Sequence, residues 1–292
     1  MSNDPNIVIM AAGASSRMQQ SLEAPDPGTK EAARLLSGLP KAMIPVGPQG
    51  RPFLDYLLLN AAKAGYSDAV IVVSVSGNSI RVRYEDFADV VALPSGLRIS
   101  FAVQEIPEER EKPAGTADAL LCALNARPDW EGQQFTVCNG DNLYPVSSLR
   151  TVLESAYENS ILAYDSRGLG IPRAKLETFA VIKTDSEGHV LEIIEKPDPE
   201  AYESAVDETG RINVSMNVLR FSRDMILPIL GEVPFDPVRD EKELPAAVRI
   251  LIDRHPGSLR AIPLSESVPD LTSSGDISAV IGYIRQNYPA FE

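Results

Sequence analysis

Three small residues, Ala11, Ala12 and Gly13, follow an apolar run at residues 7–10, and Arg17 stands shortly after them. Small residues let a ligand approach the backbone, and successive N–H groups in such a turn form an anion-binding concavity. Arginine adds a bidentate fork that suits phosphate. The stretch indicates a phosphate-binding loop, although it is neither a dinucleotide fingerprint nor a P-loop. A tight strand-to-helix turn with a surface arginine is equally compatible with it.

Further along the chain, Lys41 could join this phosphate loop, Gln104 could face a base, and Thr116 opens an ordinary helix entry that capping explains. Lys41 lies between two prolines, which stiffen its loop, although a solvated lysine is the simpler interpretation. Gln104 ends an apolar segment and either faces a base edge or caps the strand. Gly115 and Thr116 open a segment with helical pattern, in which Thr116 is a good N-cap.

Two aspartates stand out, Asp141 as a candidate metal ligand and Asp270 as a residue that local structure does not explain. Asp141 follows an apolar segment in the sequence Asn-Gly-Asp-Asn, at the position where a Mg²⁺ ion bound to phosphates would be held. Turns also favour these residue types for backbone reasons. Ser273 and Asp276 have the spacing of a capping box, which explains both of them and leaves Asp270 unexplained.

Glu195 and Lys196 end a further apolar segment and are followed by a proline. Neighbouring residues of a strand point to opposite faces, so we expect no simple salt bridge between these two. One of them is then expected to face the ligand side of the sheet.

The elements that must position these residues alternate between strands and helices in the first half of the chain. Strands are predicted at residues 6–11, 69–75, 97–104, 134–139 and 160–165, and helices at 53–65, 116–126 and near 147–158. Such alternation implies right-handed βαβ units and a mostly parallel sheet. We therefore expect the loops after residues 11, 104 and 139 to gather at the carboxyl ends of the strands, where ligands bind.

The second half of the chain changes character. A hairpin with its turn at 186–188 and a strand at 212–221 are predicted as antiparallel additions to the sheet, with helices at 242–254 and 276–288. No flexible linker or repeat divides the chain. We expect one domain over residues 1–292, with an insertion at 19–39.

The net charge of −14 argues against nucleic-acid binding, which calls for a basic face. No apolar run is long enough to span a bilayer, and the N-terminal sequence lacks the basic region of a signal peptide. Cys122 and Cys138 lie in apolar segments and are expected to be reduced, as in a cytoplasmic protein. Only two histidines are present, which makes a histidine-based metal site improbable.

Taken in order, AAGASSR, PKAMIP, Gln104 with GTADAL, NGDN, EKP and DLTSSGD resemble the motifs of the sugar-1-phosphate nucleotidyltransferases. The resemblance covers most of residues 6–285 and implies a GT-A-like, Rossmannoid α/β fold with helices on both faces of the sheet. It also implies the reaction, in which a nucleoside triphosphate and a sugar 1-phosphate form a nucleotide sugar and pyrophosphate. Members of this family often self-associate, so the resemblance is compatible with a homo-oligomer.

The resemblance assigns roles to individual residues. Arg17 and Lys41 would neutralise the triphosphate, Lys196 would hold the sugar phosphate, and Asp141 and Asp270 would share a Mg²⁺ ion. The residues implied around the nucleotide are Ala11, Ala12, Gly13, Arg17, Gln104, Gly115 and Thr116, and those around the sugar phosphate are Gly140, Glu195, Lys196 and Asn213. Two departures from the family concern substrate choice, namely the insertion at 19–39 and the altered sugar-side strand at 212–221.

Three other functions are compatible with parts of the pattern. The altered sugar side permits an acceptor such as phosphocholine or another polyol phosphate. A non-catalytic regulatory protein that binds nucleotide sugars would not need the pair Asp141 and Asp270. A glycosyltransferase would be expected to carry an Asp-x-Asp motif, where this chain has Asn139 and Asp141.

Overall fold

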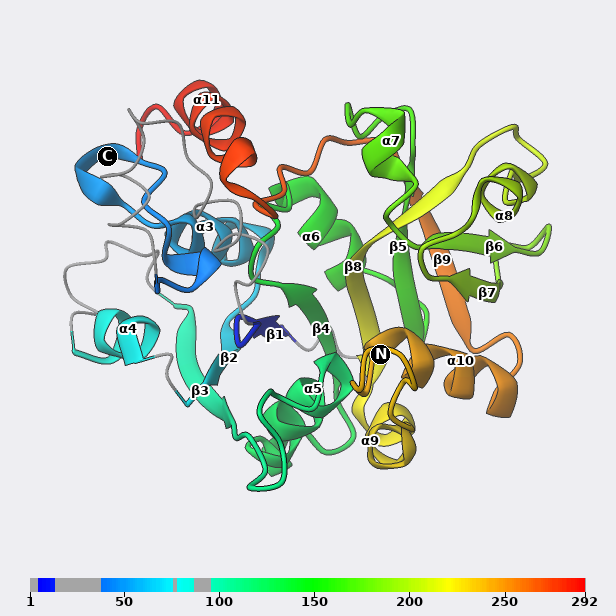
Figure 1. The fold of residues 1–292 in the computed structure, drawn as a ribbon, viewed down its shortest axis with the longest axis horizontal. Coiled ribbons are helices and arrows are strands. Elements are labelled where there is room, and N and C mark those ends of the chain that lie inside the picture. Colours follow the sequence, from blue (N-terminus) through cyan, green and yellow to red (C-terminus); the bar gives the residue numbers. More distant parts are fainter. Residues whose placement is uncertain (1–4, 14–37, 76–77, 87–95, 292) are drawn as a thin grey trace.

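The computed structural model describes residues 5–13, 38–75, 78–86 and 96–291. Arg17 and residues 19–37 of the predicted insertion lie outside the described residues. Within the described part of the chain, one nine-stranded sheet has the main order β3-β2-β1-β4-β8-β5-β9, and β6 and β7 lie off this path. Helices cover both faces of this sheet (Figure 1).

Four parallel strands form the first part of the sheet. They are β1 (Asn6–Met10), β2 (Asp68–Ser74), β3 (Arg98–Gln104) and β4 (Gln134–Asn139). Met10 is in register with Asn139, and Ser74 with Gln104, so these strands end together. The expectation that the loops after residues 11, 104 and 139 gather at one edge is confirmed. We call this side of the sheet the carboxyl edge.

The second half adds antiparallel strands, as expected. Strand β8 (Asn213–Ser222) pairs antiparallel with both β4 and β5 (Asn159–Asp165). The hairpin of β6 (Val181–Thr184) and β7 (Val190–Ile194) joins the sheet where Val181 meets Val214. Strand β9 (Leu259–Leu264), which the sequence pattern did not predict, pairs parallel with β5.

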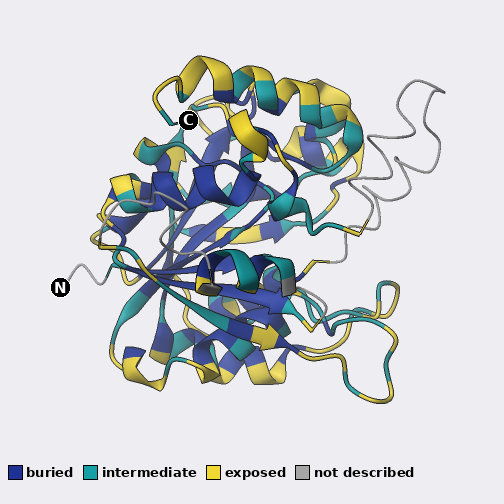
Figure 2. Ribbon diagram, turned by 90° about the vertical axis from the view of Figure 1, so that its left-hand side faces the viewer, coloured by how far each residue is buried: buried dark blue, intermediate teal, exposed yellow. Residues whose placement is uncertain are grey.

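Two hydrophobic layers hold the helices on the sheet. Ile7 and Ile9 of β1 face one cluster, while Val8 faces the other, as expected for alternating side chains of a strand. The first cluster includes residues of α3 (Phe53–Ala64), α6 (Val146–Leu153) and α11 (Ile277–Asn287). The second includes residues of α5 (Thr116–Asn125), α9 (Arg223–Glu232) and α10 (Leu244–Arg254). Figure 2 shows buried strands between helices whose outer faces are exposed.

Short helices complete the described fold: α4 (Asn78–Arg81), α7 (Arg173–Leu176) and α8 (Pro199–Ser204). Most predicted helices begin and end within about two residues of their observed bounds. The prediction near 147–158 is too long, since α6 ends at Leu153. The Gln134 side-chain amide donates to the carbonyls of Tyr157 and Glu158, which holds that segment in a bend just before β5. No helix among the described residues is both long and apolar enough to cross a membrane.

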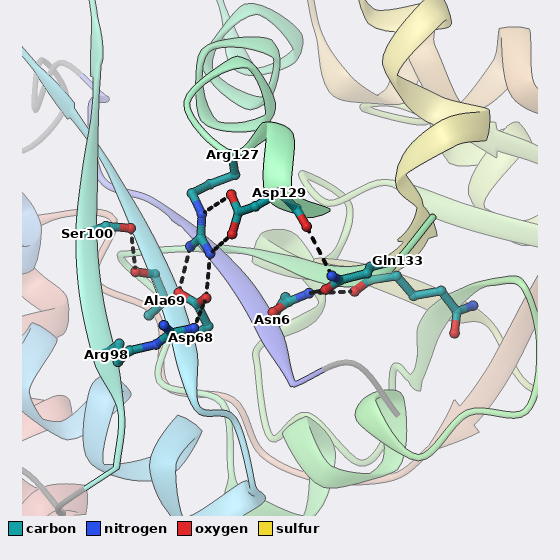
Figure 3. Close-up of polar contacts among 9 residues, drawn as sticks. Asn6, Asp68, Ala69, Arg98, Ser100, Arg127, Asp129 and Gln133 are labelled. Carbon is teal, nitrogen blue, oxygen red and sulfur yellow. Dashed lines mark hydrogen bonds and ion pairs between the residues drawn. The ribbon is translucent and has the colours of Figure 1, made fainter. Parts of the chain in front are cut away.

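The edge opposite the carboxyl edge carries a polar network that joins the starts of the parallel strands (Figure 3). Arg127 donates to both carboxylate oxygens of Asp68, at 2.6 and 2.5 Å, and also contacts Asp129. Arg98 of β3 donates to Asp68 at 2.8 Å. Asn6 of β1 donates to the Gln133 side chain at 2.8 Å. This network stabilises the sheet far from the ends at which ligands are expected.

Candidate active site

The loops after β1 and β4 touch through their backbones at the carboxyl edge. Gly140 N–H donates to the Met10 carbonyl at 2.9 Å, and Ala11 N–H donates to the Val72 carbonyl at 2.9 Å. A Cβ atom on Gly140 would lie 3.1 Å from the Met10 carbonyl oxygen and 3.2 Å from Cβ of Ala11. Glycine at position 140 therefore lets the two loops pack closely.

Asp141 and Asp270, which are distant in the sequence, are neighbours in the fold. Asn142 and Asp270 form an isolated antiparallel bridge, and Leu271 N–H donates to the Asp141 carbonyl at 2.9 Å. The Asn142 amide donates to Oδ1 of Asp270 at 3.4 Å. The late segment that contains Asp270 thus pairs with the loop after β4, which brings the two predicted metal ligands together.

Each of these carboxylates is paired with a lysine. Lys41 Nζ lies 2.9 Å from Oδ2 of Asp141, and the lysine begins a short 3₁₀ helix, Lys41–Met43, directly after Pro40. Lys175 Nζ lies 3.1 Å from Oδ2 of Asp270 and 2.9 Å from Oδ1 of Asp276. Lys175 was not singled out from the sequence, because it lies in the short helix α7 with no motif around it.

The two aspartates fit a Mg²⁺ ion that is also bound by substrate. Burial raises the pKa of Asp270, and the neighbouring negative charge of Asp141 raises it further. A divalent cation would relieve this like-charge repulsion. Among the described residues no group of three or more His, Cys, Asp or Glu side chains could hold a metal. Magnesium commonly takes one or two carboxylates together with phosphate oxygens and water, so a two-carboxylate set suits it.

The predicted nucleotide side brings Gln104 and Gly115 together. The buried Gln104 amide donates to the Gly115 carbonyl at 2.9 Å and to Asp118 at 2.8 Å. Gly115 has φ of 115°, and a Cβ there would lie 2.4 Å from the Lys242 carbonyl oxygen. The prediction that Thr116 is the N-cap is wrong. Gly115 occupies that position, and the Thr116 hydroxyl instead accepts a hydrogen bond from the backbone N–H of the residue that begins α10.

The predicted sugar side has a different backbone from the one expected. Strand β7 ends at Ile194, and Lys196 has φ of 44°, so the expectation that Glu195 and Lys196 alternate within a strand is wrong. Pro197 follows and cannot donate to a ladder, which is consistent with the strand ending here. Lys196 is exposed, while Glu195 is half-buried. Burial raises the pKa of Glu195, and the negative charge of Glu243 raises it further.

Glu195 lines a hollow beside β8. Ser215 and Asn217 of β8 also line it, and α10 covers it with Leu244, Pro245 and Val248. Asn217 has φ of 56° where the pairing of β8 with β5 is irregular, a conformation that Asn adopts more readily than most residues. The sequence prediction named Asn213 instead, and its side-chain amide donates to Asp207 at 3.0 Å. The sequence feature that could have identified Asn217 is a polar asparagine within an otherwise apolar strand.

A mixed, mostly parallel α/β sheet with helices on both faces, and with small-residue loops and two neighbouring carboxylates at its carboxyl edge, places the chain in the Rossmann-like class. The chain belongs to the nucleotidyl transferase family, whose model matches residues 34–258. The expected GT-A-like fold and the family resemblance are both confirmed by this match and by the mixed sheet.

Several curated proteins are similar to this chain. A glucose-1-phosphate adenylyltransferase of Corynebacterium efficiens is 27% identical over 160 residues, which are 54% of this chain and 38% of that protein. The bifunctional protein GlmU of Trichlorobacter lovleyi is 25% identical over 78% of this chain and 44% of its own. The UTP–glucose-1-phosphate uridylyltransferase YngB of Bacillus subtilis is 25% identical over 61% of this chain and 63% of its own. The chain thus spans less than half the length of the first two relatives.

Proposed function

We propose that this protein transfers a nucleotidyl group from a nucleoside triphosphate to a sugar 1-phosphate, forming a nucleotide sugar and pyrophosphate in a Mg²⁺-dependent reaction. The observation that carries the proposal is the meeting of Asp141 and Asp270 at the carboxyl edge, with Lys41 on the first of them. The printed names of the relatives, an adenylyltransferase and a uridylyltransferase of glucose 1-phosphate, support the same reaction class.

The chemistry of this reaction suits the residues present. The attacking phosphate oxygen of the acceptor is ionised at neutral pH, so no histidine is needed as a general base. The protein must hold two polyanions in line and offset the charge that gathers around the α-phosphate. Bound Mg²⁺, held by Asp141 and Asp270, would supply charge neutralisation between the two substrates.

The lysines and the remaining residues take complementary roles in the proposal. Lys41 contacts the triphosphate, Lys196 holds the acceptor phosphate, and Glu195 accepts hydrogen bonds from sugar hydroxyls. The proposed triphosphate contact Arg17 lies outside the described residues. The nucleotide lies against Ala11, Ala12, Gly13, Gln104, Gly115 and Thr116, and Gly140 and Asn213 stand on the acceptor side.

Two features of the chain bear on where and how the protein acts. Cys122 and Cys138 are both free thiols, which supports a reducing, cytoplasmic setting. We also propose that residues 1–292 act as one catalytic domain, with the 19–39 segment contributing to nucleotide choice. Self-association remains part of the proposal because it is common in the family.

Pyrophosphate release tests the proposal. Purified protein is assayed in a grid of nucleoside triphosphates against sugar 1-phosphates, with phosphocholine as a non-sugar acceptor, each with Mg²⁺ or with EDTA. The proposal predicts metal-dependent release with one or a few sugar 1-phosphates. Pyrophosphate release with phosphocholine alone would show that the acceptor is not a sugar phosphate. Binding of nucleotide sugars without pyrophosphate release under any condition would favour the regulatory function.

A further inference from the structure

Lys175 connects the proposed metal site to the start of the last helix. Its ammonium group lies 3.1 Å from the Asp270 carboxylate and 2.9 Å from that of Asp276. Asp276 also accepts from the backbone N–H of Ser273 at 2.8 Å, completing the predicted capping box before α11. Asp276 therefore anchors Lys175 independently of Asp270.

The ammonium group of Lys175 is held between two carboxylates, those of Asp276 and Asp270, and the side chain of Lys175 is 32% exposed. The side chain of Asp270 is only 6% exposed, so the Lys175 ammonium is a nearby charge that water screens weakly. Thr272 also donates to the same carboxylate oxygen, which fixes the orientation of Asp270.

Lysines offset part of the negative charge at this site in the absence of substrate. Asp141 contacts Lys41, and Asp270 contacts Lys175, which Asp276 shares, so three carboxylates face two ammonium groups. A free divalent cation therefore meets less negative charge at Asp141 and Asp270 than two unpaired carboxylates would present. The phosphates of a bound nucleotide would add the negative charge that the protein side chains do not supply to the cation.

We propose that Lys175 is a positioning residue for Asp270, which holds this carboxylate in place and offsets its charge so that a divalent cation binds tightly only together with substrate phosphates. This inference rests on the proposed function, because it assumes that Asp141 and Asp270 hold the metal. Lys175 has no assigned contact with substrate, and its effect is exerted through Asp270.

Titration of Mn²⁺ into substrate-free protein, followed by the electron paramagnetic resonance of free Mn²⁺, tests this inference without any turnover. Lys175→Met is expected to bind Mn²⁺ about tenfold more tightly than the native protein, the effect of removing one unit charge a few ångström from a divalent ion. Lys175→Arg keeps the charge and is expected to bind Mn²⁺ as the native protein does. Lys175→Gln also removes the charge and is expected to tighten Mn²⁺ binding in the same way, so it replaces Lys175→Met if the methionine protein folds poorly.

Two further variants control for indirect effects. Lys183→Met removes a lysine from a surface pair with Glu192, at 3.6 Å on β6, and is expected to leave Mn²⁺ binding unchanged. Asp276→Asn weakens the capping box but leaves Lys175 on Asp270, so it is not expected to tighten binding. If Asp276→Asn matched Lys175→Met, the effect would come from the helix cap and the inference would be wrong.

The remaining outcomes separate this inference from the proposed function. Mn²⁺ binding to Lys175→Met that is no tighter than native, or equally tight binding by Lys175→Arg, would overturn the role of Lys175. Asp141→Asn and Asp270→Asn, each placed in the Lys175→Met background, are expected to abolish the gain. A gain that survives both would show that the cation binds elsewhere, and the metal site of the proposed function would then fail.

Discussion

Replacing Arg127 with methionine is expected to lower the stability of the fold without touching the site. The change leaves Asp68, whose side chain is 6% exposed, with Arg98 as its ion-pair partner among the described residues, and the side chain of Arg98 is 78% exposed. Breaking a buried ion pair by removing one partner costs about 3–5 kcal/mol. Arg98 retains part of the interaction, and methionine preserves some packing on Trp130, over which the guanidinium lies at 4.4 Å. The expected cost is about 2–3 kcal/mol.

Urea unfolding and thermal melting measure this cost. With an unfolding entropy of about 2.1 cal/mol/K per residue over the 292 residues, 2.5 kcal/mol corresponds to a fall of about 4 °C in the melting midpoint. Turnover per folded molecule is expected to stay native, because the network joins the starts of the parallel strands and the site lies at their carboxyl ends. Arg98→Met is the matched control and is expected to cost under about 0.5 kcal/mol. Equal costs for the two variants would refute the argument that the buried Arg127–Asp68 pair contributes more to stability than the exposed Arg98–Asp68 pair.

Three further predictions concern single groups. Gly115→Ala is expected to lose about 2 kcal/mol or more in urea unfolding, because its φ of 115° is strained for alanine and its Cβ would lie 2.4 Å from the Lys242 carbonyl oxygen; a cost below about 0.5 kcal/mol would contradict this. Glu195→Gln is expected to raise the free energy of unfolding near neutral pH but not near pH 4. Burial raises the pKa of Glu195, and the negative charge of Glu243 raises it further, so ionisation of this carboxyl near neutral pH destabilises the fold. An equal gain at both pH values would disprove this. Burial raises the pKa of the Cys122 thiol to about 11, so about a thousandth of this thiol is ionised at pH 8. Iodoacetamide is therefore expected to modify Cys122 far more slowly than free cysteine, and comparable rates would refute this prediction.

The parallel part of the sheet was predictable because local sequence determines it. β-branched runs such as that of Asp68–Ser74 favour buried strands, and their alternation with helices implies parallel order. The carboxyl-edge loops then follow from topology. Asp270 was identified because helix capping left it unexplained and because it matches the late family motif, and the structure brings it to Asp141.

The features that were missed depend on contacts between distant segments. Lys175 meets Asp270 only in the folded chain, and a helix as short as α7 has no periodicity to reveal it. Strand β9 contains Pro263 and charged or exposed positions, so pairing with β5 outweighs its weak local preference. The left-handed backbone at Lys196 and Asn217 is set by packing around the hollow at Glu195, and residue type alone does not specify it.

The fate of the α-phosphate tests the central claim most directly. The protein is incubated with Mg²⁺, a nucleoside triphosphate labelled at the α-phosphate and the matching sugar 1-phosphate, and the products are separated. The account predicts that the label appears in the nucleotide sugar, with unlabelled pyrophosphate released, and that Asp141→Asn and Asp270→Asn each abolish this transfer. Label in free nucleoside monophosphate, or native transfer by either variant, would contradict it.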